Sequence, residues 1–331
     1  MPYSRTIALI LLLASGVGAI SAQEKNEPSS KLLIAFASYK ERARQPKIHF
    51  YEHDGIDKGK FVGHIDTVNQ RSDHHPSLSH DGRFCAFSSE LENQVGKITL
   101  WDLKEKKVVD LPKLNDSPNS ILRPSLSADG KVLAFAAWNR PMAGTRWQVL
   151  LYDIAEKRLA DIPGLNQGSY DQRMPAISGD GKWIAYSTNA REGAGQTDIF
   201  LFDREQKKVQ MLPELNSKNS DNEPSLSADG KLLAFVSERP GGMGGRDVLL
   251  FDRSVNKFVA LPGLNSGAHD QSPSLSPDGR YIVFVSERIS GVGERDVYLY
   301  DRVAGQLLPT PGLNAKAEDI DPCVIVLPGK E

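Results

Sequence analysis

The chain has 331 residues, with 40 Lys and Arg against 42 Asp and Glu, so its formal net charge is −2. Hydrophobic residues make up 40% and charged residues 25% of the sequence, which are ordinary values for a globular protein. They exclude a disordered chain, a collagen and a protein with many membrane spans, and the balanced charge gives no indication of a nucleic-acid partner.

The N-terminus predicts an export signal. Residues 1–22 combine Arg5 with an apolar run from Ile7 to Ile20, and a short polar leader follows over 23–31. The apolar run would span roughly 21 Å as a helix, against about 30 Å of bilayer hydrocarbon. A cleaved signal is therefore favoured over a retained anchor. We expect a mature chain without membrane insertion, in a periplasm or outside the cell.

Six copies of one unit follow over residues 32–328. Three kinds of residue recur in agreeing registers: a proline, the acid of an aromatic–Asp pair, and an asparagine. The prolines are Pro76, Pro124, Pro175, Pro224, Pro273 and Pro322; the acids are Asp102, Asp153, Asp203, Asp252 and Asp301; the asparagines are Asn69, Asn115, Asn166, Asn216, Asn265 and Asn314. Self-similarity with a period near 49 residues is the signature of a repeat architecture.

Each unit contains four strand-like runs, of which PSLS, LLAFVS, VLLFD and KRLADI are examples. The second and third runs are almost continuously apolar, which predicts strands that are covered on both faces. An Asp-Gly pair between the first and second runs predicts a tight turn, because glycine accepts the positive φ that such turns require. We therefore assign the repeated Asp to turn formation and not to catalysis.

The two ends of the array are complementary. The first unit begins with its second strand, KLLIAFAS, and the chain finishes with a lone first strand over 322–327. Pairing these halves completes a sheet and closes a ring without open edges. The sequence predicts an all-β fold, a six-bladed β-propeller of four-stranded antiparallel blades.

The phrases PSLSADGKLLAFVSERPGG, RDVLLFD and PSLSPDGRYIVFVSERISG resemble the WD-like repeats of the TolB propeller family. The resemblance covers residues 32–328 and does not include the α/β domain that precedes the propeller in TolB. It implies a periplasmic, non-enzymatic propeller whose loop-bearing face docks other envelope proteins, notably a peptidoglycan-associated lipoprotein.

One rim of the predicted ring carries the longer loops between the second and third strands, and function is expected there. Trp138 occupies a place where other blades carry Glu or Thr, and an exposed Trp near Arg is typical of a binding hot spot. The candidate partner-binding residues are Trp138, Arg140, Arg191, Arg239 and Arg288. Two alternatives stay open: Trp138 packs internally, and Arg239 and Arg288 brace their loops by pairing with Asp247 and Asp296.

A series of acids near the start of the first strands is the candidate metal site. The series consists of Asp73, Asp171, Asp221, Asp270 and Asp319, and Ile121 interrupts it. Oxygen ligands converging on an axis would suit Ca²⁺. The same repetition is expected if the acids satisfy backbone donors in equivalent loops, and this structural interpretation is favoured. Apart from this Ca²⁺ candidate, no cofactor is expected.

Histidines and cysteines give no strong site. Six of the seven histidines lie between His49 and His80 on different strands and turns, so a single zinc site cannot use them all. Cys85 and Cys323 begin strands near opposite rims, so we expect them to lie apart and to form no disulfide.

Three functions remain open. We expect a non-catalytic interaction scaffold, since no G-x-S-x-G, H-E-x-x-H, C-x-x-C or P-loop motif occurs. The alternative is a carbohydrate- or cation-binding propeller, including a polysaccharide-degrading enzyme, with an axial site and Trp138 or Tyr170 as a stacking ring. The third is an accessory propeller of a peptidase.

Overall fold

The computed structural model describes residues 31–40, 44–66, 71–91, 95–116, 119–139, 146–212 and 214–327. The predicted signal peptide and nearly all of the leader lie outside these residues, as do Arg140 and Asn69, so the expectations for them remain predictions. Within the described ranges, no helix has the length and apolar character needed to cross a membrane.

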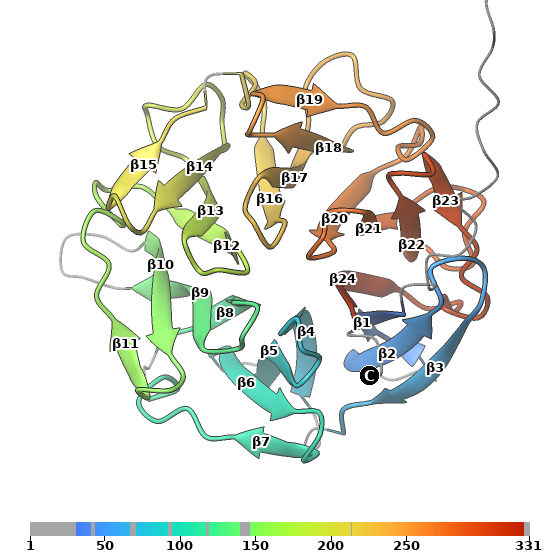
Figure 1. The fold of residues 1–331 in the computed structure, drawn as a ribbon, viewed down its shortest axis with the longest axis horizontal. Coiled ribbons are helices and arrows are strands. Elements are labelled where there is room, and N and C mark those ends of the chain that lie inside the picture. Colours follow the sequence, from blue (N-terminus) through green and yellow to red (C-terminus); the bar gives the residue numbers. More distant parts are fainter. Residues whose placement is uncertain are drawn as a thin grey trace, which may run out of the picture.

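Six four-stranded antiparallel sheets surround a central axis (Figure 1), as predicted. We name each sheet a blade and list its strands from the axis outward. Blade 1 contains β24 (Asp319–Val326), β1 (Leu32–Ser38), β2 (Lys47–His53) and β3 (Gly59–His64). Blade 2 contains β4 (Arg71–Leu78), β5 (Phe84–Leu91), β6 (Lys97–Asp102) and β7 (Lys107–Val109). Blade 3 contains β8 (Ile121–Leu126), β9 (Val132–Asn139), β10 (Arg146–Asp153) and β11 (Arg158–Ala160).

The remaining blades repeat this order. Blade 4 contains β12 (Gln172–Ile177), β13 (Trp183–Thr188), β14 (Asp198–Asp203) and β15 (Lys208–Gln210). Blade 5 contains β16 (Asp221–Leu226), β17 (Leu232–Ser237), β18 (Asp247–Asp252) and β19 (Lys257–Val259). Blade 6 contains β20 (Asp270–Leu275), β21 (Tyr281–Ser286), β22 (Asp296–Asp301) and β23 (Gln306–Leu308).

The ring closes in blade 1, where the two ends of the repeat array meet. Strand β1 pairs with β24, for example Leu33 with Ile325, so the last strand supplies the innermost position of the first blade. Buried clusters continue across this closure, because Ile34 of blade 1 packs in one cluster with Val283 of blade 6. Neighbouring blades therefore bury each other's faces around the whole ring, which explains the nearly unbroken apolar runs of the middle strands.

The repeated polar residues stabilise turns and loops. In blade 5, the Ser227 hydroxyl donates to Asp229 at 2.7 Å, Asp229 accepts from the Lys231 amide at 3.0 Å, and Gly230 has a φ of +65°. Asn265 binds both the amide and the carbonyl of Val248 at 2.9 Å. These contacts recur in other blades, so the predicted turn role of the repeated Asp is confirmed.

Four blades have a serine after the repeated proline, and this serine links neighbouring inner strands. Its hydroxyl oxygen accepts from an amide of the next blade, as Ser225 does from Leu275 at 3.0 Å. The other serine links are Ser77 with Leu126, Ser125 with Ile177, and Ser274 with Val324. In blade 1 the sulfur of Cys323 takes this place and accepts from Leu78 at 3.4 Å.

The two cysteines are free and lie in the same region, Cys85 buried and Cys323 partly buried. Cys85 and Cys323 pack in one cluster between blades 1 and 2, and no disulfide joins them. The predicted separation of the two cysteines is therefore wrong. The closure of the ring brings the last inner strand, which carries Cys323, beside blade 2.

Candidate functional site

The residue before each repeated proline turns toward the axis. All five inner strands from β4 to β20, and β24 with β1, contain a register shift at this point. The six residues have φ between +51° and +55°; they are His75, Arg123, Met174, Glu223, Ser272 and Asp321. This left-handed conformation is costly for a residue other than glycine, and a residue before proline ordinarily prefers an extended backbone. The strain falls at the positions that face the axis.

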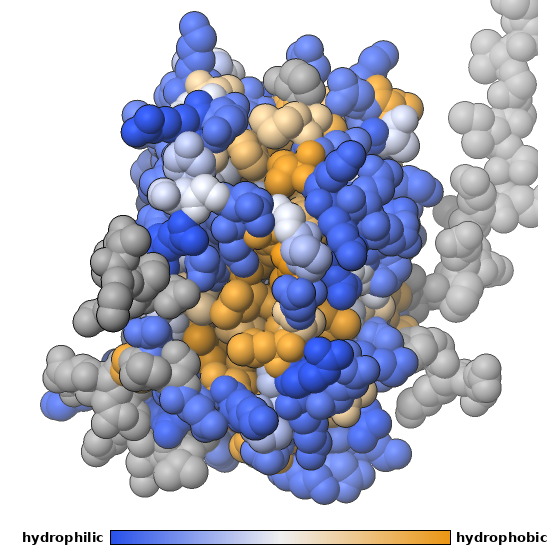
Figure 2. All heavy atoms as spheres, turned by 90° about the vertical axis from the view of Figure 1, so that its left-hand side faces the viewer, coloured by the Kyte–Doolittle hydropathy of each residue, from blue (hydrophilic) through white to orange (hydrophobic). Residues whose placement is uncertain are grey.

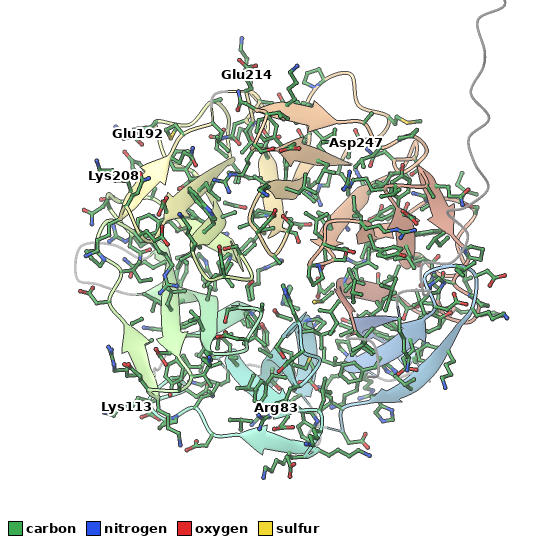
Figure 3. All side chains as sticks on the ribbon, viewed as in Figure 1. Arg83, Lys113, Glu192, Lys208, Glu214 and Asp247 are labelled. Carbon is green, nitrogen blue, oxygen red and sulfur yellow. The ribbon has the colours of Figure 1, made fainter. Side chains whose placement is uncertain are left out.

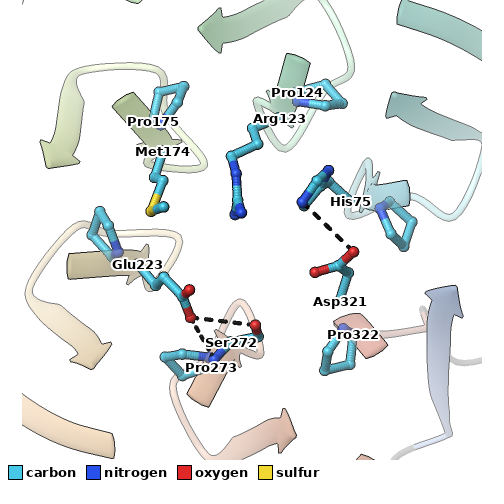
Figure 4. A pocket seen from close by; sticks show the side chains of 12 residues that line it. His75, Arg123, Pro124, Met174, Pro175, Glu223, Ser272, Pro273, Asp321 and Pro322 are labelled. Carbon is cyan, nitrogen blue, oxygen red and sulfur yellow. Dashed lines mark hydrogen bonds and ion pairs between the residues drawn. The ribbon is translucent and has the colours of Figure 1, made fainter. Parts of the chain in front are cut away.

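These six residues and their prolines enclose an axial cavity of about 120 Å³ (Figure 4). The backbone of the six positions is alike, but each side chain has a different chemistry. The neighbouring prolines keep one residue type in all six blades, whereas the residue before them differs in every blade, and this contrast makes the axial positions candidates for contact with a ligand. We missed this signal in the sequence, although the variable position before each proline was readable there.

One side of the axial cavity is lined by His75 and Asp321, and His74 lies next to them. The Asp321 carboxylate lies 3.5 Å from His74 Nδ1 and 3.6 Å from His75 Nε2. Burial lowers the pKa of His75 to about 3, so its ring is uncharged at neutral pH. Its Nδ1 atom is buried and has no hydrogen-bond partner among the described residues.

The opposite side of the cavity is already paired. Glu223 accepts from the Ser272 amide at 2.7 Å and from the Ser272 hydroxyl at 3.3 Å. This carboxylate links blades 5 and 6 at the axis, which leaves it poorly placed to bind a ligand cation.

Arg123 is the charged axial residue without a partner of its own. Its guanidinium points into the middle of the cavity, between Met174 and His75 (Figure 4). Among the described residues, no hydrogen bond or ion pair engages this side chain; only the Arg123 backbone amide is bonded, to Ser88 at 2.9 Å. A guanidinium held in this way offers a planar set of donors to a carboxylate or another anion.

A second cavity joins the axis to the looped rim. It has a volume of about 350 Å³ and shares Met174 with the axial cavity. Its lining is polar, with Arg173, Ser187, Asn189, Gln196 and Asn222 among the residues. The Ser187 hydroxyl is buried without a hydrogen-bond partner in the described part of the chain. The two cavities therefore adjoin at Met174, and polar groups of blade 4 lie on the side of the second cavity that faces the loops.

Trp138 is half-buried and lies near the second cavity. It pairs with Trp147 across β9 and β10, with the two rings 5.3 Å apart in an edge-to-face arrangement. The guanidinium of Arg173 lies 5.7 Å from the Trp147 ring, and Arg173 pairs with Asp171 at 2.7 Å. Of the other predicted partner-binding residues, Arg191 is exposed, and Arg140 lies outside the described residues.

Arg239 and Arg288 brace their blades, but not as predicted. Arg239 contacts Asp221 at 3.3 Å and Arg288 contacts Asp270 at 3.0 Å, so the proposed pairing with Asp247 and Asp296 is wrong. The carboxylate of Asp247 instead accepts from the backbone amides of its own loop, those of Met243 and Gly244. Both arginines are largely covered, with 24% and 12% of their side chains exposed.

The candidate metal-binding acids do not converge. Asp73, Asp221, Asp270 and Asp319 are fully buried in separate blades, and each meets amide, hydroxyl or basic groups of its own surroundings. Asp171 is out of register, since Gln172 occupies the equivalent buried position. Among the described residues, no three His, Cys, Asp or Glu side chains are grouped to hold a metal ion. The favoured structural interpretation agrees with this geometry.

Comparisons with known proteins were made for sequence and structure. No protein-family model matches the chain, and no curated protein matches its sequence. TolB from Acinetobacter baumannii is similar in structure, with a TM-score of 0.65 and 19% identity over 90% of this chain and 67% of that one. A structure described as TolB from Agrobacterium tumefaciens has a TM-score of 0.53 and 18% sequence identity, over 84% of this chain and 87% of that one.

Enzymes share the architecture as well. An oligogalacturonate lyase in complex with manganese gives a TM-score of 0.55 and 13% identity, over 84% of this chain and 73% of that one. Identities this low establish the fold alone. The resemblance to the TolB repeats is thereby confirmed at the level of the fold: this chain is a six-bladed β-propeller, similar in structure to the propeller of TolB.

Proposed function

We propose that this protein is an exported, non-catalytic propeller that binds an envelope protein at the axial cavity and the adjoining looped rim. The observation that carries the proposal is the set of six different side chains at six equivalent axial positions. An acidic side chain of the partner reaches the guanidinium of Arg123. The resemblance to TolB makes a peptidoglycan-associated lipoprotein the first partner to test.

The size of the axial cavity supports a protruding segment as the ligand. About 120 Å³ holds one side chain, whereas sites for drug-sized molecules have about 300–1,000 Å³. The 350 Å³ cavity beside it has room for the backbone that presents this side chain. In this arrangement Trp138, Trp147 and the exposed Arg191 flank the entrance as rim contacts.

The test is binding of the purified protein to the peptidoglycan-associated lipoprotein of the same organism, measured by calorimetry. Arg123→Gln keeps a polar side chain but removes the charge, and should weaken binding at least tenfold. Trp138→Ala should weaken it less, as a rim contact. Arg158→Gln, an exposed change on β11, is the control and should leave the affinity unchanged.

In-cell photo-crosslinking from position 196 extends the test to other envelope proteins. Enrichment of an envelope protein in the wild type, and its loss in Arg123→Gln, supports the proposal. Equal crosslinking by Arg123→Gln and the wild type would show that the axial site is not the docking site.

A second candidate function is binding or cleavage of an acidic saccharide. The Arg123 guanidinium favours it, because this group, beside His75 and Asp321, also suits a sugar carboxylate. Oligosaccharides of uronic acids are the discriminating probes. Saturable binding lost in Arg123→Gln, or formation of an unsaturated product detected by its ultraviolet absorbance, would favour the saccharide over the protein partner.

A further inference from the structure

Blade 4 contains a cavity on its outer side, away from the axis. It has a volume of about 430 Å³ and lies between blade 4 and the connection that enters this blade from blade 3. The lining includes Gln172, Tyr186, Thr188, Ala190, Glu192 and Phe200. Figure 2 looks onto this side of the molecule, where apolar atoms gather in the middle between polar margins.

Blades 5 and 6 fill the equivalent space with an arginine. In blade 5, Arg239 donates to the Leu215 carbonyl at 2.7 Å, to Asp221 at 3.3 Å and to the Ser237 hydroxyl at 2.8 Å. Its guanidinium also lies over Phe258 at 4.7 Å. Arg288 makes the same three hydrogen bonds in blade 6, with Leu264, Asp270 and Ser286, and its guanidinium lies over the Tyr298 ring of β22.

Blade 4 has the same positions around this space as blades 5 and 6, but an alanine stands in place of the arginine. Ala190 stands 49 positions before Arg239, and Gln172 stands 49 positions before Asp221. The local backbone is alike, since the Gly193 amide donates to the Ala190 carbonyl at 3.1 Å and Gly291 to Arg288 at 3.0 Å. The side chain of Arg239 is therefore replaced in blade 4 by open space of the cavity.

In blade 4, the acceptor atoms that would bind an arginine have few hydrogen-bond donors. Gln172 is only 6% exposed, and its Oε1 atom has no hydrogen-bond partner among the described residues. Among the residues that the structure describes, the Leu165 carbonyl, equivalent to that of Leu215, receives only a long 3.5 Å contact from Gln167. A buried acceptor without a donor costs about 1–3 kcal/mol, so these atoms favour a ligand that supplies donors.

The cavity also has the charge and the aromatic walls that suit a cation. The described lining contains one acid, Glu192, and no Lys or Arg. Glu192 lies on the outer side of blade 4 (Figure 3). Tyr186 and Phe200 form an edge-to-face pair 6.2 Å apart and provide ring surface for a planar guanidinium. At the margin of the cavity, the guanidinium of Arg146 is bonded to the Gly168 carbonyl.

We infer that this cavity binds the guanidinium of an arginine side chain presented by a partner protein. The partner's arginine takes the place that Arg239 and Arg288 occupy in their own blades. This site is separate from the axial cavity and does not depend on the function proposed for it.

The direct test is titration of the purified protein with N-acetyl-arginine amide, followed by NMR. Saturable shifts confined to blade 4 are expected, with affinity in the millimolar range for so small a ligand. N-acetyl-lysine amide should bind more weakly, because an ammonium cannot match the planar set of acceptors. Gln172→Asp should strengthen arginine binding about tenfold by adding a charge, and Gln172→Leu should abolish it.

A second measurement needs no ligand. Ala190→Arg should fill the cavity, abolish binding of the arginine probe and raise the melting temperature. The double variant Gln172→Asp/Ala190→Arg reproduces the Asp–Arg pair of blade 5. Its gain in melting temperature should exceed the sum of the gains of the two single variants.

The inference is overturned if the arginine and lysine probes bind equally well, or if neither binds. It is also overturned if Gln172→Leu binds the arginine probe as the wild type does. Should Ala190→Arg fail to fold, the Gln172 variants still decide the outcome, because they leave the cavity open.

Discussion

At the scale of single residues, repetition separates structural from functional positions. In four blades the residue after the repeated proline is a serine whose hydroxyl links two blades, whereas the residue before the proline differs in every blade. Blade 4 departs from the structural pattern at Ala176, which cannot supply the acceptor that Ser225 supplies in blade 5. Equivalent positions within one chain therefore act as internal controls for each other.

Removing one link between inner strands should cost measurable stability. Ser225→Ala deletes the oxygen that accepts from the Leu275 amide, and should lower the free energy of unfolding by about 1 kcal/mol. The reverse change, Ala176→Ser, should raise it by a similar amount. Urea unfolding followed by circular dichroism measures both variants. A Ser225→Ala protein as stable as the wild type would show that the link contributes nothing.

Buried Asp319 should make stability depend on pH. Burial raises the pKa of its carboxyl to about 6, from an ordinary value of 3.8. Between about pH 4 and pH 6 the folded state keeps a proton that the unfolded chain has lost, so the contribution of this group to stability falls as the pH rises. Over the whole titration, the contribution of Asp319 to the free energy of unfolding falls by about 3 kcal/mol.

Asp319→Asn removes this titration. Relative to the wild type, the variant should gain stability steadily from pH 4 to pH 6 and no further above that, as measured by urea unfolding at pH 4, 5, 6 and 7. Glu105→Gln, a change at an exposed acid, controls for the loss of one negative charge. Parallel pH profiles of Asp319→Asn and wild type would contradict the assignment.

At the scale of elements, the sequence predicted the turns but not the β-bulges, which are the register shifts in the inner strands. The Asp-Gly pairs indicated tight turns because few residues other than glycine accept a positive φ without cost. The register shift in each inner strand leaves no comparable signal, since it depends on the pairing with the neighbouring strand and on the ring of six prolines. That shift orients the axial side chains, so the axial site could not be derived from strand periodicity.

Gly230 should be sensitive to substitution for two reasons. It has a φ of +65°, and a Cβ atom there would lie 2.6 Å from the Trp183 ring of blade 4. Gly230→Ala should therefore lower the melting temperature by several degrees, an effect of about 1–3 kcal/mol. Gly263→Ala, which has a similar φ of +71° but open space around it, is the matched control for the backbone term alone. Equal losses in both variants would show that the contact with Trp183 is unimportant.

At the scale of the whole molecule, stability depends on closing the ring. Strand β24 pairs with β1 and contacts the inner strands of blades 2 and 6, so it joins both ends of the array. Closure also places Cys323 beside blade 2 and Asp321 beside His74 and His75. These neighbours are nearly 250 positions apart in the chain.

A chain that ends at Glu318 lacks β24 and should lose cooperative unfolding, with the largest loss of amide protection in blade 1. A chain that ends at Leu327 keeps β24 and serves as the control. Hydrogen exchange read by mass spectrometry measures the protection of each blade. Unchanged protection of β1 in the shorter chain would show that closure does not hold the first blade.

The sequence by itself determined the number of blades, the order of their strands, the turns and the closure of the ring. These follow from local propensities and from a period that repeats along the chain. Only the tertiary structure decided which residues face the axis, because a bulge shifts the register of each inner strand. It also decided that Arg239 pairs with Asp221 and not with Asp247, and that Gln172 of blade 4 lacks such a donor. Those outcomes depend on which side chains the fold brings together across a blade, and the spacing of residues along the chain does not specify these contacts.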